Sequence, residues 1–171
     1  MKTFRFFCLS AVALAMAIPF AACSDDDDKP SAGVPQSFVE ALKAIEPDAE
    51  NVKWETEGPW RVAEFDKAGV ECEVWFDAMS AWAMTEKDFG RDWFLVPDNA
   101  VNNAFATGEY GTWTVDDIKY YLRSSDEFYV VEVEKTGQLD MDLFFSKTGE
   151  MFKAAESSAV PDMRPDTVVN R

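Results

Sequence analysis

One pattern occurs twice along this chain, and the repetition restricts the fold more than any other feature of the sequence. Residues 34–92 and residues 93–155 each contain, in the same order, a Val-Pro pair, a short amphipathic segment, a tryptophan, and alternating segments separated by glycine turns. One shared feature could recur by chance, but the matching order of all of them indicates an internal duplication. The sequence therefore predicts an α+β fold of two tandem repeats, each a helix packed on a roughly four-stranded antiparallel sheet.

A helix is predicted at the start of each repeat. In the first repeat, Phe38, Leu42 and Ile45 have the i, i+4, i+7 spacing that places apolar side chains on one helix face. In the second, Val101 and Phe105 are four residues apart. The preceding prolines favour a helix start, because the first turn has no partner for the N–H group that proline lacks.

Alternating segments after each helix predict antiparallel strands joined by hairpin turns. They cover residues 60–65, 71–76 and 81–85 in the first repeat and residues 128–133, 139–145 and 151–155 in the second. Successive side chains of a strand point to opposite faces, so one face is apolar and suits the helices. Five large side chains are expected in the core: Trp54, Phe65, Phe76, Trp82 and Trp113.

The other side of the sheet, here named the open face, mixes acids with aromatic residues. Its predicted members are Trp60, Glu64, Glu73, Trp75, Phe128, Glu132, Asp142 and Phe144. Exposed aromatic side chains beside acids suit a surface that binds a basic or amphipathic protein partner. For Trp75 and Phe144 the alternative is cover by a loop or by the other repeat. For Glu73 and Asp142 the alternative is a solvated strand residue without a role.

Composition argues against catalysis. The chain has no histidine, which excludes histidine-based triads, imidazole general bases and the usual zinc sites. Neither a nucleophile motif nor a phosphate-binding loop is present, so we expect no catalytic residue, no cofactor and no enzyme. Cys72 is expected to be a small buried residue rather than a reactive thiol.

The first 22 residues have the layout of a secretory signal peptide. Lys2 and Arg5 precede an apolar run, residues 6–20, that is too short to be a transmembrane helix. The sequence Phe-Ala-Ala-Cys that ends at Cys23 resembles a bacterial lipobox. The resemblance implies cleavage before Cys23 and lipid attachment to it; an ordinary cleaved signal with Cys23 left free is the alternative.

Residues 23–33 then form an acidic tether. Ser24 and the four aspartates after it are similar to the export signal of Bacteroidetes lipoproteins, which implies display at the outer face of the outer membrane. The alternative is a solvated spacer on a periplasm-facing anchor. Contact with the membrane is expected only through the N-terminal lipid. The polar, proline-bearing segment 156–171 predicts a flexible tail.

The chain is strongly acidic. Its formal net charge is −16, and loss of Lys2 and Arg5 with the signal leaves 14 basic residues against 32 acids, or −18. Such a surface repels nucleic acid and favours cationic partners. A small-ligand or calcium site using Asp140 and Asp142 is the alternative function, although the sequence contains no D-x-D-x-D-G loop.

The repeats resemble the PepSY-like family, which includes tandem-repeat β-lactamase-inhibitor-like proteins. The matching residues of the first repeat are Val34-Pro35, Pro47-Asp48-Ala49, Val52-Lys53-Trp54, Trp75-Phe76-Asp77 and Trp82. Those of the second repeat are Leu95-Val96-Pro97, Trp113, Phe144-Phe145 and Lys147-Thr148-Gly149. The resemblance implies a concave sheet that grips another protein, as in an inhibitor, but no partner-specific residue carries over. The second repeat lacks the Pro-x-Ala that follows the first helix.

Overall fold

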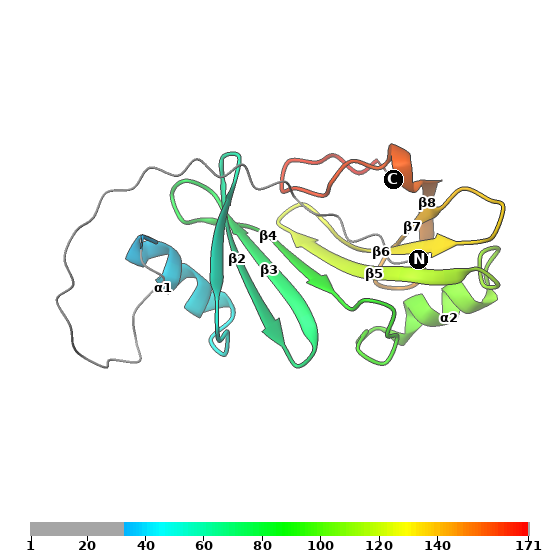
Figure 1. Ribbon diagram of the computed structural model, residues 1–171, viewed down its shortest axis with the longest axis horizontal. Helices are drawn as coiled ribbons and strands as arrows, with labels where there is room; N and C mark the ends of the chain where they lie inside the picture. Colours follow the sequence, from blue (N-terminus) through cyan, green and yellow to red (C-terminus); the bar gives the residue numbers. More distant parts are fainter. Residues whose placement is uncertain (1–32, 171) are drawn as a thin grey trace, which may run out of the picture.

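The computed structural model describes residues 33–170 (Figure 1), so the predicted signal peptide and Cys23 lie outside the described residues. The first elements are α1 (Gln36–Ile45), β1 (Lys53–Glu57), β2 (Trp60–Lys67), β3 (Val70–Phe76) and β4 (Trp82–Asp88). The later ones are α2 (Asn99–Thr107), β5 (Thr114–Arg123), β6 (Glu127–Glu134), β7 (Met141–Phe145), β8 (Met151–Glu156) and the 3-10 turn η1 (Ser157–Ala159). None of the helices described is long and apolar enough to cross a membrane.

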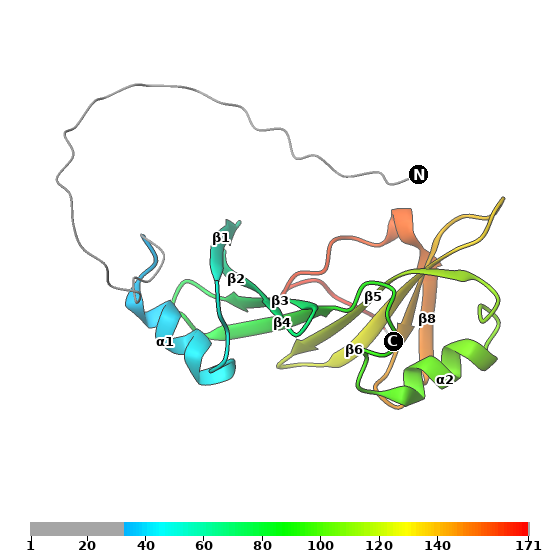
Figure 2. The same cartoon turned by 60° about the horizontal axis from the view of Figure 1, so that its bottom comes forward.

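All eight strands form one antiparallel sheet in the order of the chain, from β1 to β8. The sheet is continuous between β4 and β5, where Met84 pairs with Arg123 and Asp88 pairs with Lys119. The predicted α+β class is therefore confirmed. Both helices lie on one side of this sheet, and the chain after β8 crosses the other side (Figure 2).

Two separate apolar clusters hold the helices against the sheet. Phe38 and Leu42 of α1 pack on Phe65, Phe76 and their neighbours in β2 and β3. The second cluster joins α2 to β5, β6 and β7 through the buried residues Val101, Phe105, Ile118, Val131, Val133, Leu143 and Phe145. The predicted helix faces are thus confirmed, except that Ile45 is exposed at the end of α1.

The predicted core residues lie on this helix side. Phe65 and Phe76 are buried. Trp54 and Trp82 are half-buried against the α1 cluster, and Trp113 is half-buried against the α2 cluster. Cys72 is also buried, as predicted, and burial raises the pKa of its thiol. A buried thiol with a raised pKa forms little thiolate and is therefore unreactive.

A third apolar cluster lies on the open face, where the sequence predicted exposed side chains. Trp75 is 5% exposed, Phe128 is 1% exposed and Phe144 is 0% exposed. The prediction that these aromatic residues form an accessible surface is therefore wrong. They are covered because Val160, Met163 and other residues after β8 fold back over them.

The covering segment, residues 157–170, is named here the C-terminal strap. The sequence predicted a flexible tail in this region, whereas the strap begins with η1 and contains a turn in which the Thr167 N–H donates to the Arg164 carbonyl. A second difference concerns Leu139, the first residue of the predicted strand 139–145. It precedes β7 and is 61% exposed, beside the strap.

Candidate binding groove on the open face

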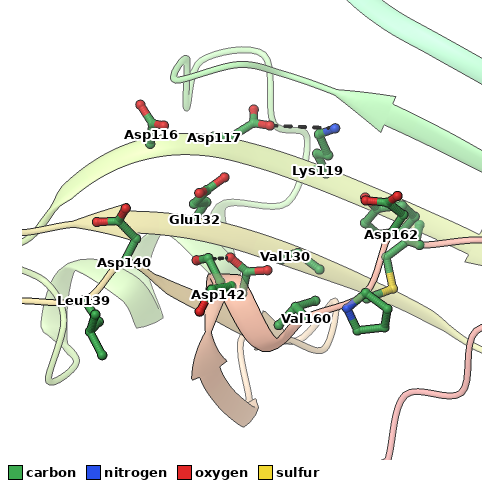
Figure 3. Close-up of a pocket in the computed structure, with 15 residues that line it drawn as sticks. Asp116, Asp117, Lys119, Val130, Glu132, Leu139, Asp140, Asp142, Val160 and Asp162 are labelled. Atoms are coloured by element: carbon green, nitrogen blue, oxygen red, sulfur yellow. Dashed lines mark hydrogen bonds and ion pairs between the residues drawn. The ribbon is translucent and has the colours of Figure 1, made fainter. Parts of the chain in front are cut away.

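A groove of about 830 Å³ lies between the strap and strands β5, β6 and β7 (Figure 3). Asp117, Lys119 and Glu132 line it from the sheet, and Val160 and Met163 line it from the strap. Strand alternation places these sheet residues on the same face as the third apolar cluster. This groove and that cluster are adjacent parts of the open face, and Val130 and Tyr121 belong to both.

Most of the charged side chains that line the groove are acidic. The six acids are Asp116, Asp117, Glu132, Asp140, Asp142 and Asp162, and Lys119 is the one basic residue in the lining. The sheet register concentrates this charge, because Asp117 pairs with Glu132 and Glu132 pairs with Asp142 on adjacent strands. Like charges directly opposite one another destabilise a sheet by roughly 0.2–1 kcal/mol a pair. Nearby, Arg91 pairs with Asp116 at the rim.

Lys119 holds together the acids of the central strands. Its Nζ lies 3.0 Å from Oε1 of Glu86, 3.5 Å from Oδ2 of Asp88 and 3.8 Å from Oδ2 of Asp117. Burial opposes a charge on Lys119, but Glu86 and Asp88 outweigh burial and raise the pKa of its ammonium group. A single lysine therefore faces three carboxyl groups and cannot neutralise them all.

Several carboxyl groups of this region have raised pKa values, chiefly because they are buried. Burial raises the pKa of Asp117 to about 7, and Asp88 adds to this shift. Burial likewise raises the pKa of Glu73 to about 7, helped by Glu86 and opposed by a hydrogen bond of 3.0 Å from Trp75 Nε1. Burial also raises the pKa of Asp142. A cationic group entering this region would favour ionisation of these carboxyls, so its binding would release protons.

The eight residues predicted for the open face lie on that face in two groups. Trp60, Trp75, Phe128 and Phe144 belong to the third apolar cluster, three of them buried. The acids follow the strands across the sheet: Glu64 pairs with Glu73, while Glu132 and Asp142 line the groove. Their role in binding stays a prediction. Within residues 33–170 no three His, Cys, Asp or Glu side chains are arranged so that they could hold a metal ion, so the calcium alternative gains no support from Asp140 and Asp142.

Sequence reasoning missed the part of the groove that β5 contributes. The alternation of Asp117, Lys119, Tyr121 and Arg123 is the signal that would have shown it, since these side chains share one face. The side of the groove that the strap forms was missed because its residues were interpreted as a flexible tail. Val160, Met163 and Val169, three apolar residues in that polar segment, are the signal there.

Residues 59–153 match the family model described as "Putative beta-lactamase-inhibitor-like, PepSY-like". The match covers more than half of the chain, and the protein therefore belongs to the PepSY-like family. No curated protein matches the chain.

Solved structures from Bacteroides species support this assignment. A BLIP-like protein from Bacteroides fragilis is 33% identical, with a TM-score of 0.68, 81% of this chain covered and 97% of that one. A DUF2874 family protein from Bacteroides uniformis is 30% identical, with a TM-score of 0.65 and coverage of 75% and 94%. A structure from Bacteroides eggerthii, described as "putative periplasmic proteins", is 28% identical, with a TM-score of 0.61 and coverage of 71% and 87%.

Proposed function

We propose that this protein is a non-catalytic binding module of the cell envelope, and that its groove holds a basic segment of a partner protein. The observation that carries the proposal is the excess of acids in the groove, six against one lysine. Three of these acids, Asp117, Glu132 and Asp142, form two cross-strand acidic pairs, which are unfavourable for the sheet alone. A cationic partner would relieve this repulsion, and the net charge of −16 would attract such a partner from a distance.

The partner of this proposal is a protein rather than a small cation. The groove is lined by residues of three strands, and the lining includes the apolar residues Val130 and Leu139 outside the strap. A basic or amphipathic segment would place cationic groups against the acids and apolar groups against Val130 and Leu139, which line the groove outside the strap. The BLIP-like name of the Bacteroides fragilis structure suggests inhibition as one consequence of such binding.

We also propose that the fold arose by tandem duplication, with residues 34–92 and 93–155 as the two repeats. A helix followed by four sequential antiparallel strands occurs once in each segment. Each helix covers its own half of the sheet through its own apolar cluster, as the α1 and α2 clusters illustrate. The cross-strand pair of Glu64 and Glu73 in the first half has its counterpart in Glu132 and Asp142 of the second half, which is consistent with a duplicated open face.

The envelope location in this proposal depends on lipid attachment to Cys23. Replacing Cys23 with alanine is expected to abolish lipidation, because the thiol is the acceptor of the lipid. Growth with an alkyne fatty acid followed by click labelling would measure this: the wild type and Cys72→Ala are labelled, and Cys23→Ala is not. Equal labelling of Cys23→Ala would contradict the proposal. Protease added to intact cells would then separate surface display from a periplasm-facing anchor.

Photo-crosslinking in living cells tests the groove. A crosslinking amino acid at Leu139, which lines the groove and is exposed, should give a discrete adduct with the partner. The same amino acid at Met79, exposed in the turn between β3 and β4, is the control and should give none. The proposal fails if Met79 yields the same adduct as Leu139, or if neither position yields one.

A further inference from the structure

The strap covers the apolar part of the open face in the way that a bound peptide would. Val160, Met163 and Val169 supply its apolar contacts to the third cluster. Beneath them lie Trp75, Phe128, Phe144 and other buried residues of β2 to β7. Its path crosses the sheet on the side opposite both helices (Figure 2). The strap forms no ladder with any strand among the described residues, and it sits on the face of the sheet rather than along its edge.

The sheet also recognises the main chain of the strap. Arg123 is buried, and its Nη1 donates to the backbone carbonyl oxygens of Arg164 and Thr167. The same guanidinium is fixed by Asp126, which accepts from its Nε at 2.8 Å and from its Nη2 at 3.0 Å. A pre-oriented arginine that contacts backbone carbonyls selects for an extended or turned peptide and not for one particular side chain.

Charge complementarity accompanies these contacts. Nη2 of Arg164 in the strap donates to Oε2 of Glu57 in β1 at 3.2 Å. Ser157 at the start of the strap donates to Oδ1 of Asp142 at 2.6 Å. The strap therefore combines apolar side chains with a basic group and a hydroxyl donor, and each meets its counterpart on the acidic, aromatic open face. These are the features that the proposed function assigns to a partner segment.

The strap is less firmly held than the sheet beneath it. Apart from η1 and the turn at Thr167, the described part of the strap has no regular secondary structure, and its Val168 is exposed. A segment with few backbone hydrogen bonds opens at a lower free-energy cost than the core strands of a domain.

We propose that the C-terminal strap is an intramolecular ligand of the open face, which a partner segment of similar chemistry must displace. The partner segment would be extended, with apolar side chains spaced like Val160, Met163 and Val169, three and six residues apart, and a basic residue that reaches Glu57. This inference rests on the proposed function and adds how partner binding is regulated. Because the strap is attached to the same chain, its effective concentration is high, and it competes with any partner for Trp75, Phe128 and Phe144.

A synthetic peptide with the sequence of residues 157–171 tests the proposal in the full-length chain. The strap is weakened by replacing Val160, Met163 and Val169 with serine, which leaves the net charge unchanged, and the exposed Val168→Ser is the control. Fluorescence anisotropy of the labelled peptide is expected to show binding to the triple variant at least about tenfold tighter than to the wild type or to Val168→Ser, since only these two retain the competing strap. A peptide with the same three serines should not bind.

Equal peptide affinity for the triple variant and the wild type would overturn the proposal. Hydrogen exchange of the wild type provides a second test that needs no variant to fold. The hydrogen-bonded strap amides of Val160, Arg164 and Thr167 should exchange at least about a hundredfold faster than those of β5 and β6, because the strap opens alone. Exchange of the strap at the rate of these strands would also overturn the proposal. Both tests leave the groove acids unchanged. A negative result would therefore refute the role of the strap without refuting the proposed binding of a basic segment.

Discussion

Replacing Phe144 with alanine is expected to lower the free energy of unfolding by about 3–5 kcal/mol, the usual cost of removing a fully buried phenylalanine side chain. Phe144 is 0% exposed, and its ring lies 6.1 Å from the ring centroids of both Phe128 and Phe152. The substitution removes these contacts and leaves a cavity in the third apolar cluster. Urea denaturation followed by tryptophan fluorescence would measure the change.

The matched control for Phe144 is Leu139→Ala. Leu139 is five residues earlier in the chain and is exposed, so its truncation should change the free energy of unfolding by less than about 0.5 kcal/mol. A cost below about 1 kcal/mol for Phe144→Ala would contradict the burial of this face. Trp75 and Phe144 are therefore unsuitable positions for testing partner binding, because truncating these buried side chains would unfold the site.

Lowering the pH from 7.5 to 5.5 is expected to stabilise the protein by about 2 kcal/mol, the reverse of the usual effect of acid on a domain held by ion pairs. Burial and neighbouring acids raise the pKa of Glu73 and of Asp117 to about 7, from ordinary values of 4.5 and 3.8. Between pH 5.5 and pH 7.5 the native state therefore binds more protons than the unfolded state. Stability from these two carboxyls is therefore lost as the pH rises through 7 and is gained as it falls toward 5.

The expected stabilisation is smaller than two fully buried carboxyls would give, because both side chains retain contact with water and Lys119 partly offsets their desolvation. Urea midpoints across this pH range would measure the effect. Glu73→Gln should flatten the profile, because glutamine does not titrate. The exposed Glu50→Gln is the control and should follow the wild type. A wild-type stability that falls steadily from pH 7.5 to pH 5.5 would contradict the prediction.

Much of the fold could be predicted because local patterns determine it. The spacing of Phe38 and Leu42 predicted the buried face of α1, and alternation in residues 71–76 placed Cys72 and Val74 on the helix side and Trp75 on the other. Glycine turns at Gly69 and Gly137 marked the hairpins between β2 and β3 and between β6 and β7, where both residues have positive φ angles.

The open face was predicted less well, because alternation assigns a side chain to a face but does not tell what covers that face. Trp75 and Phe144 were placed on the correct side and expected to be exposed there, yet the strap buries them. The strap itself has no periodicity, since its contacts depend on single residues such as Met163 and on backbone carbonyls that any sequence could offer Arg123. Contacts of this kind, distant in sequence and irregular in spacing, leave little trace in a local pattern.

The most direct measurement of the basic-segment proposal is a titration with a labelled peptide of alternating lysine and leucine at physiological salt. Asp116→Lys with Asp140→Lys reverses two accessible acids that line the groove outside the strap, and Asp48→Lys with Glu50→Lys makes the same change in net charge beyond α1. The groove pair should weaken binding about tenfold or more, since each exposed charge contact contributes up to about 1 kcal/mol and reversal adds repulsion. The control pair should change the affinity by less than about twofold. An equal loss for both pairs, or no loss for either, would contradict binding in the groove.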